Sequence, residues 1–301
     1  MRRIVSLVLF GLGAFLLTTA LLALLYIPAQ VKKTPLNIDS YTRLSGQAAV
    51  LPSGGSSPVK ALSHTVANGK LSDDGVVVFD TFSCLVKDDG TTKDCSEDTS
   101  PSSTLITAST DTFATDRVTA LPVHEERYVS AESKHEGLVN KFPFGVEQKT
   151  YAMWDGVLKR TVDATFDGEE AIGGLNTYRF KMVSQDESAE IASDIQGTYS
   201  SDKTLWIDPV TGSFIKQQEK QIRKTDTGTT VLDLDFGFTD ETVAANVESA
   251  KKSGSQLSLL AGAPWVFGAL GLLALVGGLF AARSGTVAAH ASGSNDSDTR
   301  G

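Results

Sequence analysis

The chain has 301 residues, of which 41% are hydrophobic and 21% are charged. This composition excludes an intrinsically disordered chain, and 2 cysteines are too few for a disulfide-stapled mini-domain. Residues 28–256 hold 23 of the 27 basic and 34 of the 36 acidic residues, which gives this region a net charge of −11. Because a surface this acidic repels phosphate backbones, we expect no nucleic-acid partner.

Two long apolar blocks flank this acidic region. Residues 4–27 and 257–282 carry no charged side chain over 24 and 26 residues. Each block exceeds the roughly 20 residues that a helix needs to cross a bilayer. The first block is longer than the 7 to 15 apolar residues, roughly, of a secretory signal. We therefore expect two transmembrane helices, with a cleaved signal peptide as the alternative for the first.

The flanking charges indicate the orientation. Arg2 and Arg3 precede the first block, and positive charges at the start of a first span favour a cytoplasmic N-terminus. Two spans place both ends of the chain on one side. The sequence thus predicts a plasma-membrane protein with residues 1–3 in the cytoplasm, an extracytoplasmic domain over 28–256, and a disordered cytoplasmic tail over 283–301.

The two cysteines agree with an extracytoplasmic location. Cys84 and Cys95 flank a polar, turn-rich stretch over residues 87–93 that brings two neighbouring strands back together. We expect a disulfide between them, because such bonds persist in oxidising compartments. Two unrelated thiols are the alternative.

Hydrophobic periodicity in the central region is typical of strands. Leu232, Leu234 and Phe236 alternate with polar residues, as in half-buried antiparallel strands. Residues 206–215 enclose an Asp-Pro start and a glycine finish, which predicts a hairpin. Further strands are expected over 76–86, 105–112, 147–154, 158–166 and 178–182, with loops at 53–58 and 96–104. Thr239 is positioned to cap a helix over 240–252.

The resulting fold class is mainly β, a β-rich α+β domain with few helices. Its antiparallel sheet is expected to be strongly curved, and two transmembrane helices flank it. Within the spans, the pairs Ala14 with Thr18 and Ala274 with Gly278 have the small-x-x-x-small spacing that lets helices approach closely.

Motifs that would define a reaction are absent from the sequence. His124 has Tyr128 four residues on, so the H-E-x-x-H zinc motif is incomplete, and no P-loop or G-x-S-x-G occurs. Asp233 and Asp235 share one strand face, but the alternating apolar residues predict that this face is solvated. We therefore expect no catalytic residue, metal or cofactor, and no enzyme activity.

Aromatic residues are the more informative group. Seven of them fall on or near predicted strands, and an apolar cavity lined by them would bind a ligand. The simpler interpretation is that these side chains fill a core. The candidate ligand-binding residues are Phe142, Phe144, Tyr151, Trp154, Tyr178, Phe180 and Trp206.

At this level of detail the sequence resembles a known family. The similarity is carried by the Arg-Arg start before the first span, residues 141–145, 149–151, 154–155 and 176–180, the hairpin over 206–215, and the second span. It is to actinobacterial two-span membrane proteins, grouped as a domain of unknown function or as the porin PorA family. The resemblance implies a role in envelope biogenesis, namely lipoglycan maturation and glycolipid delivery, and a lipid-binding-like fold.

Three functions follow as hypotheses. The first is a non-catalytic accessory protein that binds an envelope lipid or glycolipid beside a lipid transporter or glycosyltransferase. The second is a structural or channel-related interaction protein with a filled core, although two helical spans differ from the strands that porins use to cross membranes. The third is an extracytoplasmic hydrolase, because catalytic triads need not be adjacent in sequence. Activity lost on changing His124 or His135 would support it.

Overall fold

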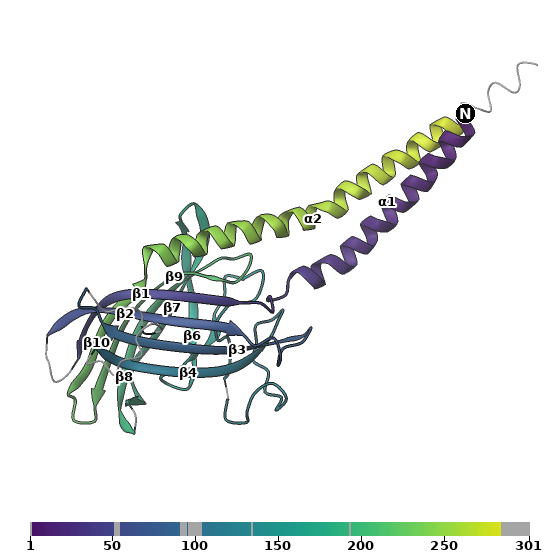
Figure 1. Ribbon diagram of the computed structural model, residues 1–301. Coiled ribbons are helices and arrows are strands. Elements are labelled where there is room, and N and C mark those ends of the chain that lie inside the picture. Colours follow the sequence, from purple (N-terminus) through teal and green to yellow (C-terminus); the bar gives the residue numbers. More distant parts are fainter. Residues whose placement is uncertain are drawn as a thin grey trace, which may run out of the picture. The chain divides into compact units, whose positions relative to one another are not determined.

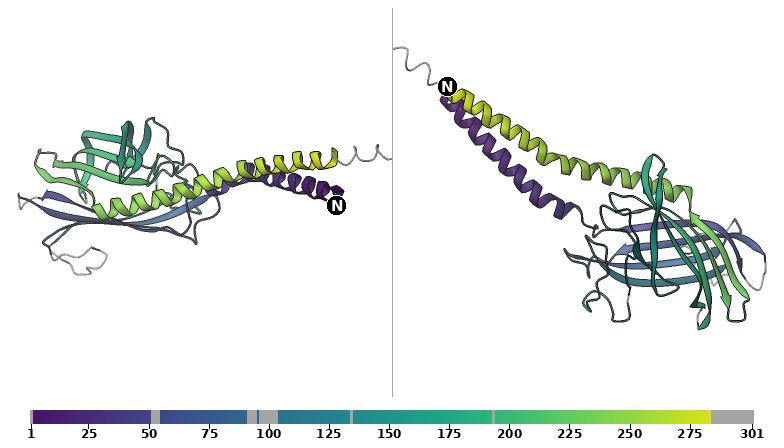
Figure 2. Two further views of the ribbon diagram at one scale, coloured as in Figure 1. Left: turned by 90° about the horizontal axis from the view of Figure 1, so that it is seen from above. Right: turned by 180° about the vertical axis from the view of Figure 1, so that it is seen from behind.

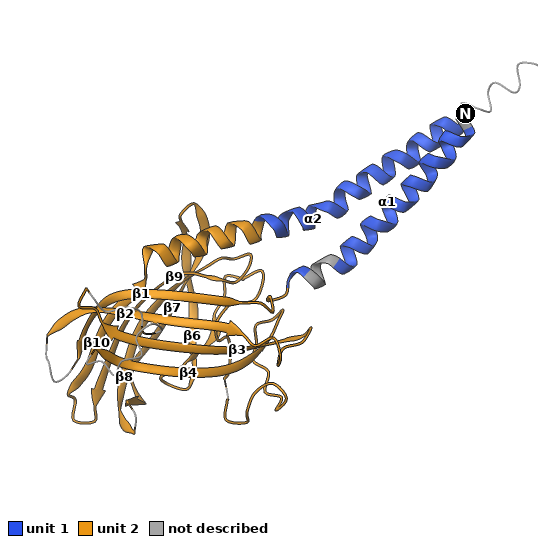
Figure 3. Ribbon diagram, viewed as in Figure 1, with its two compact units in different colours: residues 1–32, 255–301 blue, residues 33–254 orange. Residues whose placement is uncertain are grey.

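The computed structural model describes residues 2–50, 55–90, 95, 104–133, 135–192 and 194–283. They form two compact units, residues 1–32 with 255–301 and residues 33–254 (Figure 3). The second unit is called the β domain below. It lies within the region 28–256 in which the sequence predicts a single domain.

The β domain is built on one ten-stranded antiparallel sheet (Figure 1). Its order is β4-β3-β2-β1-β10-β9-β8-β7-β6-β5. Figure 2 shows that the sheet curls, so that β1 to β4 face β6 to β9 across a concave interior. This confirms the predicted mainly β fold with a curved antiparallel sheet. The strands are β1 Asp39–Val50, β2 Ser56–Ala67, β3 Val76–Lys87, β4 Leu105–Asp116, β5 Tyr151–Asp155, β6 Arg160–Ile172, β7 Leu175–Ala192, β8 Ile195–Ile207, β9 Phe214–Thr225 and β10 Thr230–Phe238.

Alternation along the strands determines which side chains face the interior. On β10, Leu232 and Leu234 are buried on the concave inner face, whereas Asp233 and Asp235 are exposed on the outer face. The sequence prediction for these two carboxylates is confirmed. Successive side chains point to opposite faces of a sheet, and residues paired across two strands face the same side. The inner and outer faces of the neighbouring strands therefore follow from their pairing with β10.

The structure corrects three of the local predictions. Strands β1 and β2 were not expected, and β2 begins at Ser56, so the loop predicted over 53–58 is wrong from residue 56 onward. Residues 53 and 54 lie outside the described residues, as do 96–103 of the second predicted loop and the tail after 283. The strand predicted over 147–154 begins only at Tyr151. Pro58 is the third residue of β2 and stands before Val59, where the pairing of β2 with β3 begins.

The hairpin predicted over residues 206–215 is confirmed. Strand β8 ends at Ile207, β9 begins at Phe214, and these two residues are paired. Asp208 holds the turn by accepting hydrogen bonds from the backbone N–H groups of Val210 and Thr211 at 3.2 and 3.0 Å. Gly212 has φ +75°, which favours glycine over residues with a Cβ.

The second helix is longer than expected. The sequence predicts a helix over 240–252 and a separate span over 257–282, but α2 runs without a break from Asp240 to Arg283. Gly254 and Pro264 both lie inside α2. A single glycine weakens a helix without ending it, so Gly254 does not separate the two predicted segments. Its first residues belong to the β domain, where Val247 and Ala250 pack on Ile215 of the outer face. The predicted cap is present, with Thr239 Oγ1 accepting from the Thr242 N–H at 3.2 Å.

The other unit contains α1, Arg2–Val31, and the rest of α2. By length and composition, both helices are apolar enough to cross a membrane. They pack closely at Gly13, where an added Cβ would lie 2.7 Å from the Leu275 side chain and 3.0 Å from the Gly271 carbonyl. Of the predicted small-residue pairs, Ala274 is buried, but Ala14 and Thr18 are exposed. The small residue of α1 that allows close packing is therefore Gly13 and not Ala14 or Thr18.

Cys84 and Cys95 form the predicted disulfide, with their Cα atoms 6.4 Å apart. On the chain-entropy model a closed loop of this length removes about 2.8 kcal/mol of unfolded-state entropy. We expect the double variant Cys84→Ser with Cys95→Ser to lose about that much unfolding free energy, measured by urea titration of the full chain in detergent. Reduction of the wild-type protein should produce the same loss. A loss under 1 kcal/mol would show that the bond does not constrain the unfolded chain.

Candidate functional site

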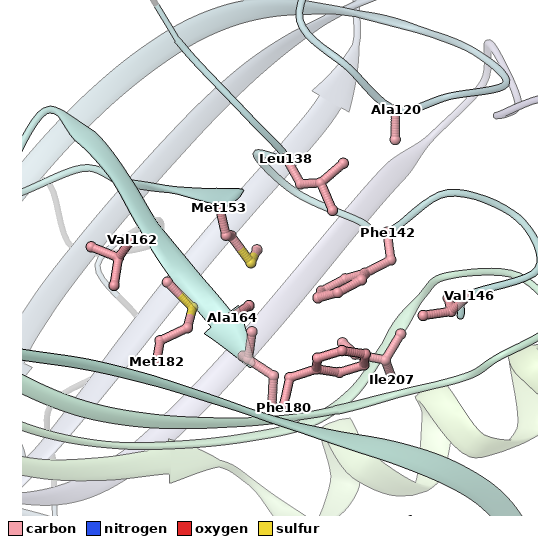
Figure 4. Close-up of a cluster of buried hydrophobic side chains, with 11 residues drawn as sticks. Ala120, Leu138, Phe142, Val146, Met153, Val162, Ala164, Phe180, Met182 and Ile207 are labelled. Atoms are coloured by element: carbon pink, nitrogen blue, oxygen red, sulfur yellow. The ribbon is translucent and has the colours of Figure 1, made fainter. Parts of the chain in front are cut away.

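Three of the seven predicted aromatic residues lie in a filled core. Phe142 and Phe180 have no exposed surface, and their ring centres are 4.7 Å apart. Figure 4 shows them packed with Met153, Met182 and the other members of this cluster. Tyr151 contacts the Phe142 ring edge at 5.1 Å. This arrangement is that of close-packed side chains, and ligand binding by these residues stays a prediction.

Three of the predicted residues lie elsewhere in the β domain or at the margin of this core. Tyr178 packs edge-on against Phe166 at 5.6 Å. Phe144 has the Lys141 Nζ atom 3.9 Å from its ring centre, and burial lowers the pKa of Lys141 to about 8. Trp206 lies on the outer face, where its Nε1 donates to Glu170 at 2.8 Å. None of the three lines the interior cavity that is described next.

A cavity of about 730 Å³ opens in the β domain, and Trp154 is the one predicted residue that lines it. Its walls come from β4, the segment before β5, β5 itself, the turn between β5 and β6, β8 and β9. A volume of this size is within the range of small-molecule sites, roughly 300 to 1,000 Å³. The wall differs from the expected apolar cavity, because polar and charged side chains contribute a large part of it.

A buried polar network forms the β8 and β9 side of the cavity. Glu219 is 3% exposed, and its Oε1 accepts from Ser201 at 2.9 Å and from Gln221 at 3.1 Å. Tyr199 is 1% exposed, and its hydroxyl donates to Asp155 Oδ2 at 3.2 Å. Burial, followed by the charges of Glu219 and Asp155, raises the pKa of Tyr199 far above its ordinary value, so it remains a neutral donor.

Lys203 supplies the matching positive charge. Its Nζ lies 3.1 Å from Glu219 Oε2, and the side chains of Lys203 and Glu219 are 20% and 3% exposed. Burial opposes the charge of Lys203, but the carboxylates of Glu219 and Asp155 outweigh it and raise its pKa above 10.5. Four acids and two lysines line the cavity in total, so its wall is acidic overall. They are Asp111, Glu132, Asp155, Glu219, Lys159 and Lys203.

His135 lies across the cavity and is 5% exposed. Its Nε2 is 2.8 Å from Asp111 Oδ2 on β4, and its Nδ1 is 3.3 Å from Ser133 Oγ. The imidazole ring packs on Phe113 at 5.3 Å and on Trp154 at 4.8 Å. These contacts hold the ring in one orientation, with one nitrogen toward the carboxylate and the other toward the hydroxyl.

Residues 117–138, called the strap below, bring His135 to this position. All of them except residue 134 are among the described residues. At one end the Val123 N–H donates to the Ala114 carbonyl of β4 at 2.9 Å. At the other end Leu138 donates to Ala152 of β5 at 2.9 Å and accepts from Trp154 at 2.7 Å. The strap therefore joins the two edge strands of the curled sheet next to the cavity.

Most of the cavity residues were not predicted from the sequence. Tyr199, Ser201 and Lys203 continue the inner-face positions of Leu205 and Ile207 along β8, but there the apolar residues give way to polar ones. This change within one alternating face is the signal that could have identified them. Across the chain, no three described His, Cys, Asp or Glu side chains converge as a metal site would require.

Comparison with known proteins gives one family match. The model of a family described as Porin PorA matches residues 5–280, which is nearly the whole chain. No curated protein matches the sequence. Among solved structures, a DUF1329 family protein from Desulfovibrio piger ATCC 29098 is 11% identical, with 77% of this chain and 92% of that chain covered. Its TM-score of 0.19 is too low to support any further comparison.

Proposed function

The chain belongs to the porin PorA family, and we propose that it is a membrane-anchored protein that binds an envelope lipid or glycolipid in the cavity of its β domain. The observation that carries this proposal is the 730 Å³ cavity with Trp154 on its wall. Burying charged and polar side chains beside an open cavity is costly unless they make hydrogen bonds. A preformed polar wall of this kind is suited to the polar head of an amphiphile.

The composition of the wall favours a glycolipid over a phospholipid. Because carboxylates outnumber lysines on the wall, an anionic phosphate is repelled. Neutral sugar hydroxyls can donate to Glu219 and accept from Gln221 and Lys203, and a sugar ring can pack on Trp154. In this proposal the head group occupies the cavity, while the filled aromatic cluster stays part of the structural core.

The membrane anchors determine where this binding takes place. We place both termini in the cytoplasm and the β domain outside the plasma membrane, in agreement with the disulfide and with the charges before α1. A domain tethered at both ends travels only a short distance, so it suits an accessory role beside a lipid transporter or a glycosyltransferase. Envelope biogenesis is the process in which such a role fits.

Replacing Trp154 with alanine should abolish retention of the ligand. The full chain is extracted from its native membrane in mild detergent, and bound lipid is measured by native mass spectrometry and lipid extraction. We expect a stoichiometric glycolipid on the wild type and a loss of at least ten-fold in Trp154→Ala. Trp206→Phe is the matched control, because Trp206 lies on the outer face. Equal losses in the two variants, or an empty folded wild type, would contradict the proposal.

A second candidate function is supported by the filled aromatic core. If the cavity is empty in the purified protein, a structural or channel-related interaction protein becomes the better interpretation. Its spans would then assemble with other membrane helices, and chemical cross-linking in native membranes would show a defined oligomer or partner.

A further inference from the structure

We propose that Ser133, His135 and Asp111 form a nucleophile, base and carboxylate that cleave or transfer an ester of the molecule bound in the cavity. All three residues line the cavity, and the inference rests on the proposed function because that cavity must admit the substrate. An ordered chain of this kind is the arrangement by which a serine hydroxyl becomes a nucleophile. It assigns a reaction to a chain whose sequence shows no catalytic motif.

The hydrogen bonds determine which nitrogen of His135 acts as the base. Asp111 Oδ2 is 2.8 Å from Nε2, and a carboxylate accepts, so Nε2 carries the proton and donates it. The lone pair of Nδ1 then faces Ser133 Oγ at 3.3 Å. In the Ser-His-Asp template Nε2 is the base and Nδ1–H binds the carboxylate, so the two ring nitrogens exchange roles in this arrangement.

The environment holds the base in place. Phe113 and Trp154 contact the His135 ring on β4 and β5, and His124 Nε2 is 2.7 Å from the His135 carbonyl oxygen. The Ser133 hydroxyl donates to the Thr112 carbonyl in the resting protein. Rotation about its Cβ–Oγ bond redirects that proton to Nδ1 without moving the oxygen. Asp111 is a positioning residue, because it acts on the substrate through His135.

The reaction balances with water as the co-reactant. Ser133 Oγ bonds to the carbonyl carbon of the ester while its proton passes to His135 Nδ1. The ester C–O bond then breaks, and the departing alcohol takes the proton from Nδ1, which leaves an acyl group on Ser133. Water repeats the attack with the same base and releases the carboxylic acid. A sugar hydroxyl in place of water would give acyl transfer.

The test uses the full chain in detergent and an alkyl fluorophosphonate, which reacts with activated serines. We expect one adduct by intact mass, and peptide mapping should place it on Ser133 rather than on Ser109 or Ser130. This readout needs no variant, so it cannot be lost through misfolding. Hydrolysis of p-nitrophenyl butyrate and octanoate is followed in the same preparation. An unlabelled Ser133 in the folded wild type would overturn the inference.

Variants distinguish a serine activated by a triad from a serine that is labelled only because its hydroxyl is accessible. Ser133→Ala should abolish the adduct, and His135→Gln and Asp111→Asn should each slow labelling at least 100-fold with circular dichroism unchanged. Ser130→Ala is the matched control, because Ser130 is an exposed serine of the same strap and does not line the cavity. Unchanged labelling of Ser133 in His135→Gln would overturn the role of the base. Lipid retained by an unreactive wild type would refute this inference alone, whereas labelling of a protein that holds no lipid would refute the proposed binding function.

Discussion

Replacing Lys203 with methionine should destabilise the β domain by about 3 to 5 kcal/mol, because it leaves the Glu219 carboxylate buried without its cation. The pair has an Nζ to Oε2 distance of 3.1 Å, and the Glu219 side chain is only 3% exposed. Ser201 and Gln221 still donate to Glu219 Oε1, but neutral donors do not replace a charge. Urea unfolding of the full chain in detergent, followed by near-UV circular dichroism, measures the loss.

Two comparisons make this prediction specific. Lys220→Met removes a lysine from β9, the strand that carries Glu219, but its partner Asp235 is 60% exposed and Lys220 itself 74%, so we expect less than about 1 kcal/mol. The double variant Lys203→Met with Glu219→Gln should recover part of the loss, because the buried charge is removed with its partner. Equal losses for Lys203→Met and Lys220→Met would contradict a buried ion pair.

The pH dependence of stability follows from the same pair. The pKa of Lys203 is raised above 10.5 in the folded protein, so the folded state holds its proton more tightly than the unfolded chain does. Its stabilising contribution is therefore complete below pH 10.5 and is lost as the pH rises through the folded-state value. In Lys203→Met this alkaline loss should be smaller, because the variant has no amine to deprotonate at this position. Melting temperatures of the two proteins between pH 7 and 11.5 test this difference.

The sequence predicts those strands whose buried face carries large apolar residues. On β10, Leu232 and Leu234 mark the inner face clearly. The inner positions of β1 include Gly46 and Ala48, which carry almost no hydrophobic signal, so this strand was missed. Gly46 has a packing reason, since an added Cβ would lie 2.0 Å from the Asp235 carbonyl of β10. The need for glycine at position 46 arises only when β1 pairs with β10, so the sequence of β1 by itself does not reveal it.

The cavity was harder to predict because it depends on pairings between distant strands. Lys203 and Glu219 are cross-strand partners, and single-sequence periodicity does not give the register between β8 and β9. Asp111 meets His135 only because the strap passes beside the edge of β4. Of the predicted aromatic residues, Trp154 alone lines the cavity. The hydrophobicity of a residue does not distinguish a position in the core from a position on a cavity wall.

Replacing Gly212 with alanine should cost about 3 to 5 kcal/mol, more than expected for a surface turn. Gly212 has φ +75°, where a side chain adds strain. It also packs against the backbone of the aromatic core, since an added Cβ would lie 2.1 Å from the Phe142 carbonyl. If the added methyl group pushes these two backbone segments apart, the 2.8 Å hydrogen bond from the Phe142 N–H to the Gly212 carbonyl breaks.

Gly228, in the turn between β9 and β10, is the matched control. Its φ of +81° is similar, but nothing lies within 4 Å of an added Cβ. Gly228→Ala should therefore show only the cost of the strained backbone, about 1 to 2 kcal/mol. The difference between the two variants measures how strongly the hairpin turn holds Phe142 over the core. Because Phe142 has no exposed surface and contacts Phe180, displacing it opens the aromatic cluster. Similar losses from the two alanine variants would show that this turn is not required to hold Phe142.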